Sequence, residues 1–140
     1  MKNSITKAIL FSVVTACSSL SFAATCTKVM NNNVVNGNLN VPENAVCVLN
    51  GSVINGDINA GKNSSLTVNS ATIQGDVTAQ NSKAVKLDKA TVNGDVKLNQ
   101  IASSIVIDKS VINGDLTCAG NIKSTGGMNV VRGDVQGKCK

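Results

Sequence analysis

The 140-residue sequence contains no histidine, tryptophan or tyrosine, and its only aromatic residues are Phe11 and Phe22. Both phenylalanines lie in the segment 1–23, so the rest of the chain has no aromatic side chain. Globular cores normally draw much of their buried area from aromatic residues. Valine, isoleucine, leucine and alanine must therefore fill the core, which favours a narrow interior between stacked β-strands.

The same absences limit the chemistry that the chain can carry out. General acid–base catalysis usually relies on histidine or on paired carboxylates, whereas the carboxylates here are few and evenly spaced. Nucleic-acid binding requires clustered basic residues, and single-strand binding usually adds aromatic stacking platforms. The 13 basic residues, against 8 acidic ones, are scattered instead. We therefore expect no enzyme, no cofactor and no nucleic-acid partner.

Residues 1–23 have the pattern of a secretory signal peptide. Lys2 and Lys7 give the segment a positively charged start, and residues 8–16 form a short apolar run. Ser21-Phe22-Ala23 then supplies small residues at the positions that signal peptidase recognises. The apolar run is too short to span a bilayer as a helix. We expect export to the periplasm or the exterior, and a mature chain, residues 24–140, that keeps 11 basic and 8 acidic residues once the two lysines are removed.

The same segment has a second interpretation. Val14-Thr15-Ala16-Cys17 resembles a lipoprotein box, in which Cys17 is lipidated and becomes the mature N-terminus. Lipidation would tether the protein to a membrane of the envelope. Ordinary cleavage is favoured, because Ser21-Phe22-Ala23 is a good cleavage site and the apolar character continues past Cys17.

From residue 24 onward one pattern, a pair of β-branched residues followed by a polar residue, glycine, an Asn or Asp and an apolar residue, occurs six times. Its glycines stand at positions 37, 56, 75, 94, 114 and 133, so the successive intervals are 19, 19, 19, 20 and 19. The copies are Val34–Leu39, Val53–Ile58, Thr72–Val77, Thr91–Val96, Val111–Leu116 and Val130–Val135. Such regularity is the signature of a solenoid.

A second apolar pair and a small residue recur at fixed distances before the four middle glycines of the series. The pairs alternate with polar residues, which is the period of a β-strand, and the small residue lies four positions before the glycine. The pairs are Cys47/Leu49, Leu66/Val68, Val85/Leu87 and Ile105/Ile107, and the small residues are Ser52, Ala71, Ala90 and Ser110. The sequence predicts an all-β chain: a single parallel β-solenoid (β-helix) of about six 19-residue coils, each with three short strands. We expect Asn-Gly to form one corner because both residues tolerate a positive φ.

Four cysteines follow the leader: Cys26, Cys47, Cys118 and Cys139. An even number in an exported chain suggests disulfides. The interval from Cys26 to Cys47 is 21, and the interval from Cys118 to Cys139 is the same, which places each pair on neighbouring coils. Any other pairing joins positions at least 71 apart, roughly 18 Å at the spacing of stacked strands, and a disulfide needs Cα atoms within about 7 Å. We predict Cys26–Cys47 and Cys118–Cys139, clamping the two ends.

These motifs carry a resemblance. Cys47-Val48-Leu49-Asn50-Gly51 after Pro42, the Asn-Gly-Asp series, and the segments 114–118 and 133–139 resemble a family of small exported bacterial β-solenoid repeat proteins with terminal cysteine pairs. The resemblance covers nearly all of residues 24–140 and implies no established activity. A more distant likeness is to bactofilins, polymer-forming β-solenoids that are cytoplasmic or membrane-associated and do not depend on disulfide clamps.

The aspartate after most of the repeat glycines suggests a site. Asp57, Asp76, Asp95, Asp115 and Asp134 form a column of carboxylates. Such a column could bind Ca²⁺; alternatively, each carboxylate is solvated and accepts a hydrogen bond from a turn amide. Arg132-Gly133-Asp134 spells an integrin-type tripeptide, but it is also the last copy of the corner. A threonine column of the kind that binds ice would be interrupted, because Val53 and Val111 flank Thr72 and Thr91.

The leading functional hypothesis is a non-catalytic structural or interaction protein of the bacterial envelope or exterior, such as a surface, matrix or adhesion component. Its partner would be a protein or a polysaccharide of the envelope. The alternative is a ligand-binding module for calcium or envelope polysaccharide. We expect Pro42, the irregular residues 119–129 and the disulfides to cap the ends, so that any self-association is lateral and not end to end.

Overall fold

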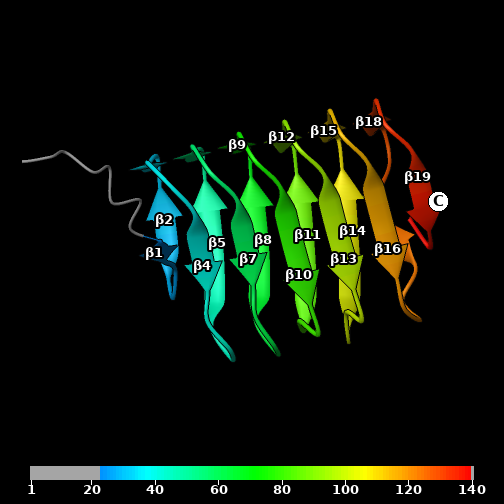
Figure 1. The fold of residues 1–140 in the computed structure, drawn as a ribbon, viewed down its shortest axis with the longest axis horizontal. Helices are drawn as coiled ribbons and strands as arrows, with labels where there is room; N and C mark the ends of the chain where they lie inside the picture. Colours follow the sequence, from blue (N-terminus) through cyan, green and yellow to red (C-terminus); the bar gives the residue numbers. More distant parts are fainter. Residues whose placement is uncertain (1–22, 140) are drawn as a thin grey trace, which may run out of the picture.

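The computed structural model describes residues 23–139, which contain strands and turns and no helix. The strands form three parallel sheets that wind around one axis as a rod of about six coils (Figure 1). The predicted β-solenoid is therefore confirmed. Cys17 and residues 1–22 of the predicted leader lie outside the described residues.

Each coil contributes one strand to each of the three sheets, here called A, B and C. Sheet A contains β1 (Ala24–Thr25), β4 (Leu39–Val41), β7 (Ile58–Ala60), β10 (Val77–Gln80), β13 (Val96–Asn99), β16 (Leu116–Ala119) and β19 (Val135–Gly137). Sheet B contains β2 (Val29–Asn31), β5 (Val46–Asn50), β8 (Ser65–Asn69), β11 (Ala84–Asp88), β14 (Ser104–Asp108) and β17 (Ser124–Thr125). Sheet C contains β3 (Val34–Val35), β6 (Val53–Ile54), β9 (Thr72–Ile73), β12 (Thr91–Val92), β15 (Val111–Ile112) and β18 (Val130–Val131).

Neighbouring coils are in register, so that like residues stack on like. Val77 pairs with Val96 in sheet A, and Ile54 pairs with Ile73 in sheet C. The one longer repeat keeps this register because its extra residue lies in a connection. Residues 81–83 join β10 to β11, whereas residues 100–103 join β13 to β14.

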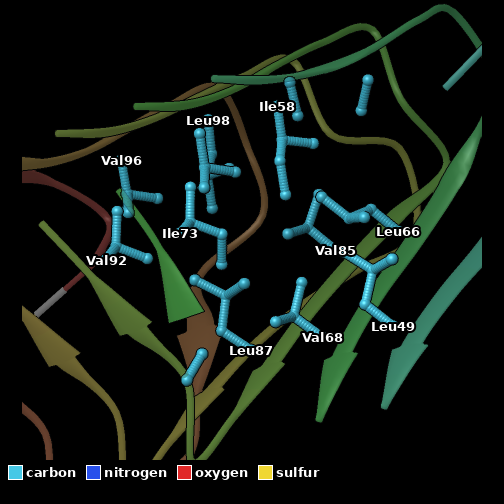
Figure 2. Close-up of a cluster of buried hydrophobic side chains, with 14 of the residues drawn as sticks. Leu49, Ile58, Leu66, Val68, Ile73, Val85, Leu87, Val92, Val96 and Leu98 are labelled. Atoms are coloured by element: carbon cyan, nitrogen blue, oxygen red, sulfur yellow. The ribbon is translucent and has the colours of Figure 1, made fainter. Parts of the chain in front are cut away.

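The core consists of aliphatic side chains that point inward from all three sheets (Figure 2). Leu49, Val68 and Leu87 follow one another up the inner face of sheet B, and all three are fully buried. Small residues fill the corner between sheets B and C, as the spacing predicts; they are Ser52, Ala71, Ala90 and Ser110, and all are buried. The hydroxyl of Ser110 donates to the carbonyl of Asp108 over 2.9 Å, which satisfies the polar group in this narrow space.

The predicted reason for glycine at the Asn-Gly corner is wrong. Of the six repeat glycines only Gly37 has a positive φ, of 126°. Positive φ values occur instead at the other two corners, for example at Asn63 and Lys89. The later glycines are required by space. At Gly94 a Cβ would overlap the Asp76 carboxylate and come within 2.7 Å of the Gly75 carbonyl oxygen in the preceding coil.

Two expectations about the ends also change. Pro42 lies in the connection between β4 and β5, and β4 is covered on one side by β1, so Pro42 is not at the end of the rod. The irregular residues 119–129 still build a coil, because they contain β17, whose Ser124 and Thr125 pair in register with β14. The described chain both starts and ends on sheet A, with β1 and β19.

The glycine corners give the first prediction. Gly94→Ala should lower the free energy of unfolding by roughly 1–3 kcal/mol, the usual cost of forcing extra atoms into a packed site. Gly127→Ala is the matched control, because a Cβ there meets no heavy atom within 4 Å and its φ is not positive. Urea unfolding of both variants measures the difference. Equal losses would contradict the close approach between coils.

Candidate interaction surfaces and terminal disulfides

Both predicted disulfides are present. Cys26 and Cys47 are bonded with their Cα atoms 5.4 Å apart, and Cys118 and Cys139 are bonded with a Cα separation of 5.2 Å. The first bond ties the residue after β1 to β5, and the second ties β16 to the residues after β19. Three of the cysteines are buried, and Cys139 is half-buried. Two structural disulfides are consistent with an oxidising, non-cytoplasmic compartment.

The aspartate column forms a ladder of hydrogen bonds between coils. The backbone amide of Asp76 donates to Oδ1 of Asp57 over 2.8 Å, and the amide of Asp95 donates to Oδ1 of Asp76 over 2.8 Å. The same bond recurs up to Asp134, whose amide donates to Asp115. In the first coil Asn38 takes the role of the acceptor, over 2.9 Å. The Asp or Asn side chain of one coil therefore lies beneath the glycine of the next coil. This explains why glycine and Asp or Asn occur together in the repeat.

The ladder confirms that backbone amides of the turns donate hydrogen bonds to the aspartate side chains. One oxygen of each carboxylate, from Asp57 to Asp115, already accepts an amide proton. Within residues 23–139 no three acidic, cysteine or histidine side chains gather in a way that could hold a metal ion. The tripeptide Arg132-Gly133-Asp134 is built into the ladder as its last rung, because a Cβ on Gly133 would overlap the Asp115 carboxylate.

Amide side chains form further ladders on the outside, where asparagine stacks on asparagine. Along sheet B, Asn50 donates to Asn31 and Asn69 donates to Asn50, each over 2.8 Å. Next to sheet C, Asn55 donates to Asn36 over 2.7 Å. The signal was present in the sequence, because asparagine recurs at an interval of 19 at these positions. Like the aspartate ladder, these bonds tie coil to coil.

The outer face of sheet C is a straight column of β-branched residues. In register it reads Val34, Val53, Thr72, Thr91, Val111 and Val130. The register confirms that valines flank the two threonines. Val34 and Val130, the first and last of the column, are 64% and 51% exposed, whereas the four between them are half-buried by their neighbours.

The other two outer faces are more polar. Sheet A presents a column of hydrogen-bonding side chains with one charge, namely Thr25, Asn40, Asn59, Thr78, Lys97, Thr117 and Gln136. The column of sheet B reads Val29, Val48, Thr67, Lys86, Val106 and Thr125, so a lysine divides it.

The charged residues around β11 and β14 are exposed or half-buried and are of mixed sign. They are Lys86, Asp88, Lys89, Asp108 and Lys109. Lys109 lies 3.5 Å from Asp108, and elsewhere Lys97 lies 3.7 Å from Asp95. Exposed pairs of this kind contribute little to stability.

The part of the chain that the structure describes encloses no pocket. No helix within residues 23–139 has the length and apolar character that crossing a membrane requires. Comparison of the chain with known protein families, with curated proteins and with solved structures finds no match.

The aspartate ladder gives the second prediction. Asp76→Ala removes the acceptor of the Asp95 amide and should lower the free energy of unfolding by about 1–3 kcal/mol, the cost of an unpaired polar group in a partly buried site. Asp76→Asn keeps an Oδ1 acceptor, as Asn38 does in the first coil, and should cost much less. Urea unfolding of the two variants compares them. An equal loss in both would show that the negative charge matters and the hydrogen bond does not.

Proposed function

We propose that the protein is a non-catalytic structural or interaction protein that is exported to the bacterial envelope or exterior. One observation carries the proposal: the three outer faces are straight columns of side chains that repeat once per coil. The repeat is about 4.8 Å, the spacing of paired strands. A surface of this kind suits a partner that is itself flat or repetitive, such as a polysaccharide strand or another copy of the rod.

Sheet C is the face best suited to side-by-side association. Its column carries no charge, whereas the columns of sheets A and B each contain a lysine. Uncharged β-branched residues pack well against a similar face, and charges on a sheet surface oppose such contact. The two disulfides and the coil-to-coil ladders tie successive coils together.

The alternative is a ligand-binding module for envelope polysaccharide or calcium. The column on sheet A favours a polysaccharide, because its hydroxyl and amide groups recur at a regular interval along the rod. For calcium, the remaining carboxylate oxygen of each aspartate in the ladder is the candidate ligand.

Location is the third prediction. If residues 1–23 are a cleaved signal, protein recovered from the periplasm or the medium should begin at Ala24, and its intact mass should lack that segment. The same mass should be lower by about 4 Da than that of the reduced form, because two disulfides remove four hydrogens. A lipidated species that starts at Cys17 would overturn the assignment and make the protein a membrane-anchored lipoprotein.

The function itself is tested by the fourth prediction. In sedimentation velocity with EDTA present, we expect concentration-dependent association that T72K/T91K abolishes, because the two lysines would lie in the middle of the sheet C column. N40K/N59K on sheet A is the matched control and should leave the association unchanged.

Two results would favour the alternative. One is a thermal unfolding midpoint that rises when Ca²⁺ replaces EDTA, since a ligand that binds the folded state stabilises it. The other is co-sedimentation with purified envelope polysaccharide that N40K/N59K removes and T72K/T91K leaves intact.

A further inference from the structure

The unequal strand numbers of the three sheets constrain how two rods can meet. Sheet A has seven strands, whereas sheets B and C have six each, because β1 precedes the first strand of sheet B and β19 follows the last strand of sheet C. Suppose that β1 of a second copy stacked on β19. Its β2 and β3 would then lie about 9.6 Å from β17 and β18, twice the roughly 4.8 Å that strand pairing requires. Two of the three sheets would be interrupted.

If the second copy keeps its β1 in place, continuous stacking is achieved in only one other way. If β2 and β3 of the second copy pair with β17 and β18, its β1 must lie on β16, where β19 lies now. Without β19, each sheet would have six strands, and the helical order of sheets A, B and C would continue from one copy into the next. The strand β19 and the β1 strand of an incoming copy therefore compete for one place.

The strand β1 fits that place in pattern and in backbone direction. In β19, Val135 and Gln136 pair with Leu116 and Thr117; in β1, Ala24 and Thr25 hold the equivalent positions on the next strand of their own sheet. Both strands thus turn an apolar residue inward and a polar residue outward. The amides of Ala24 and Cys26 donate to β4 and the residue before it, so by the alternation of a parallel ladder the amide and carbonyl of Thr25 face the free edge.

The side chains at the two ends are complementary as well. Val34 begins and Val130 ends the outer column of sheet C, and both are more than half exposed. On the inside, Ile122 and Val131 are only partly buried at the C-terminal end. Continued stacking would place Val34 of the second copy next to Val130. It would also place Met30 over Gly126, which follows Ile107 in the inner column and has no side chain.

We propose that β19 is a plug, locked by the Cys118–Cys139 bond, and that its release makes the C-terminal end of the rod a binding site for the N-terminal coil of a second copy. The strand holds its place weakly by itself, since Val135 is only half-buried and Gln136 and Gly137 are exposed. An incoming copy pairs three strands and covers the open end of the core. Because β19 belongs to the same chain, its effective concentration at this site is high. The disulfide in addition keeps an incoming strand from displacing it.

The bond can be opened by a dithiol through thiol–disulfide exchange. The dithiol becomes a disulfide, and Cys118 and Cys139 become thiols, so two electrons and two protons pass to the protein. Cys139 is half-buried, whereas Cys26 and Cys47 of the other bond are buried. The bond that holds the plug is therefore the more accessible of the two.

The test uses a form that begins at Ala24, made with a cleavable leader, so that it does not depend on the proposed signal cleavage. This form keeps all 19 strands. C118A/C139A removes the lock, and alanine already occupies the same inner column at Ala60 and Ala79. In sedimentation equilibrium its average mass should rise with concentration to several times the monomer mass, and negative-stain images should show filaments one rod wide.

Two controls identify the interface. C26A/C47A removes the other disulfide and leaves β19 locked, so it should form no filament. T25P in the C118A/C139A background removes the amide that faces the free edge of β1, and it should restore the monomer without loss of the β-sheet circular dichroism spectrum. T72K/T91K in the same background should leave the filaments intact, which separates them from the side-by-side association proposed above.

Other outcomes would overturn the proposal. They are a C118A/C139A protein that stays monomeric, filaments that persist with T25P, and filaments of the fully oxidised chain. Should C118A/C139A fail to fold, the native form treated with a dithiol replaces it, with mass spectrometry after alkylation to show that Cys118 and Cys139 alone have opened. A folded protein with these two thiols free and no change in mass would equally refute the plug.

Discussion

The structure depends on close contact between equivalent corners of successive coils. The Asp or Asn of one coil reaches under the glycine of the next and accepts the amide proton of the residue after it, over 2.8–2.9 Å. This contact is made only when the same corner recurs at the same height in each coil. The coil length therefore has to stay constant, and the one extra residue is accommodated in the 100–103 connection, away from this corner. The parallel register of all three sheets follows from that constancy.

The fold could be predicted almost completely, because a repeat of nearly constant length makes each local pattern recur from coil to coil. Cysteine pairing followed from the same register. The role of glycine did not, since positive φ and steric exclusion both select glycine and only the structure distinguishes them. At Gly94 the excluded volume is that of the carboxylate of Asp76, which belongs to the preceding coil. Contacts of this kind depend on how deeply a side chain bends beneath the next coil, which no residue pattern reports.

The candidate surfaces were harder to predict than the core. An inward residue is recognised by its apolar character, but outward columns differ only in which polar or β-branched residue occupies them. In the sequence, Thr72 and Thr91 suggest a threonine column, whereas their valine neighbours determine the character of the face. The amide ladder from Asn31 to Asn69 arises from residues that look like ordinary turn asparagines in the sequence. Their importance lies in stacking, a property of pairs of coils.

The ends of the rod pose a problem that the interior does not. Every interior strand is paired on both sides, whereas the strands of a terminal coil keep one free edge and invite another chain to pair. Short terminal strands reduce this hazard, and β1, β17 and β18 are the shortest kind of strand in the rod. The odd strand of sheet A reduces it further, because it makes the two ends mismatched by one strand while leaving the interior coils alike. A single short strand, Val135–Gly137, held by one disulfide thus separates a discrete rod from a chain that can extend without limit.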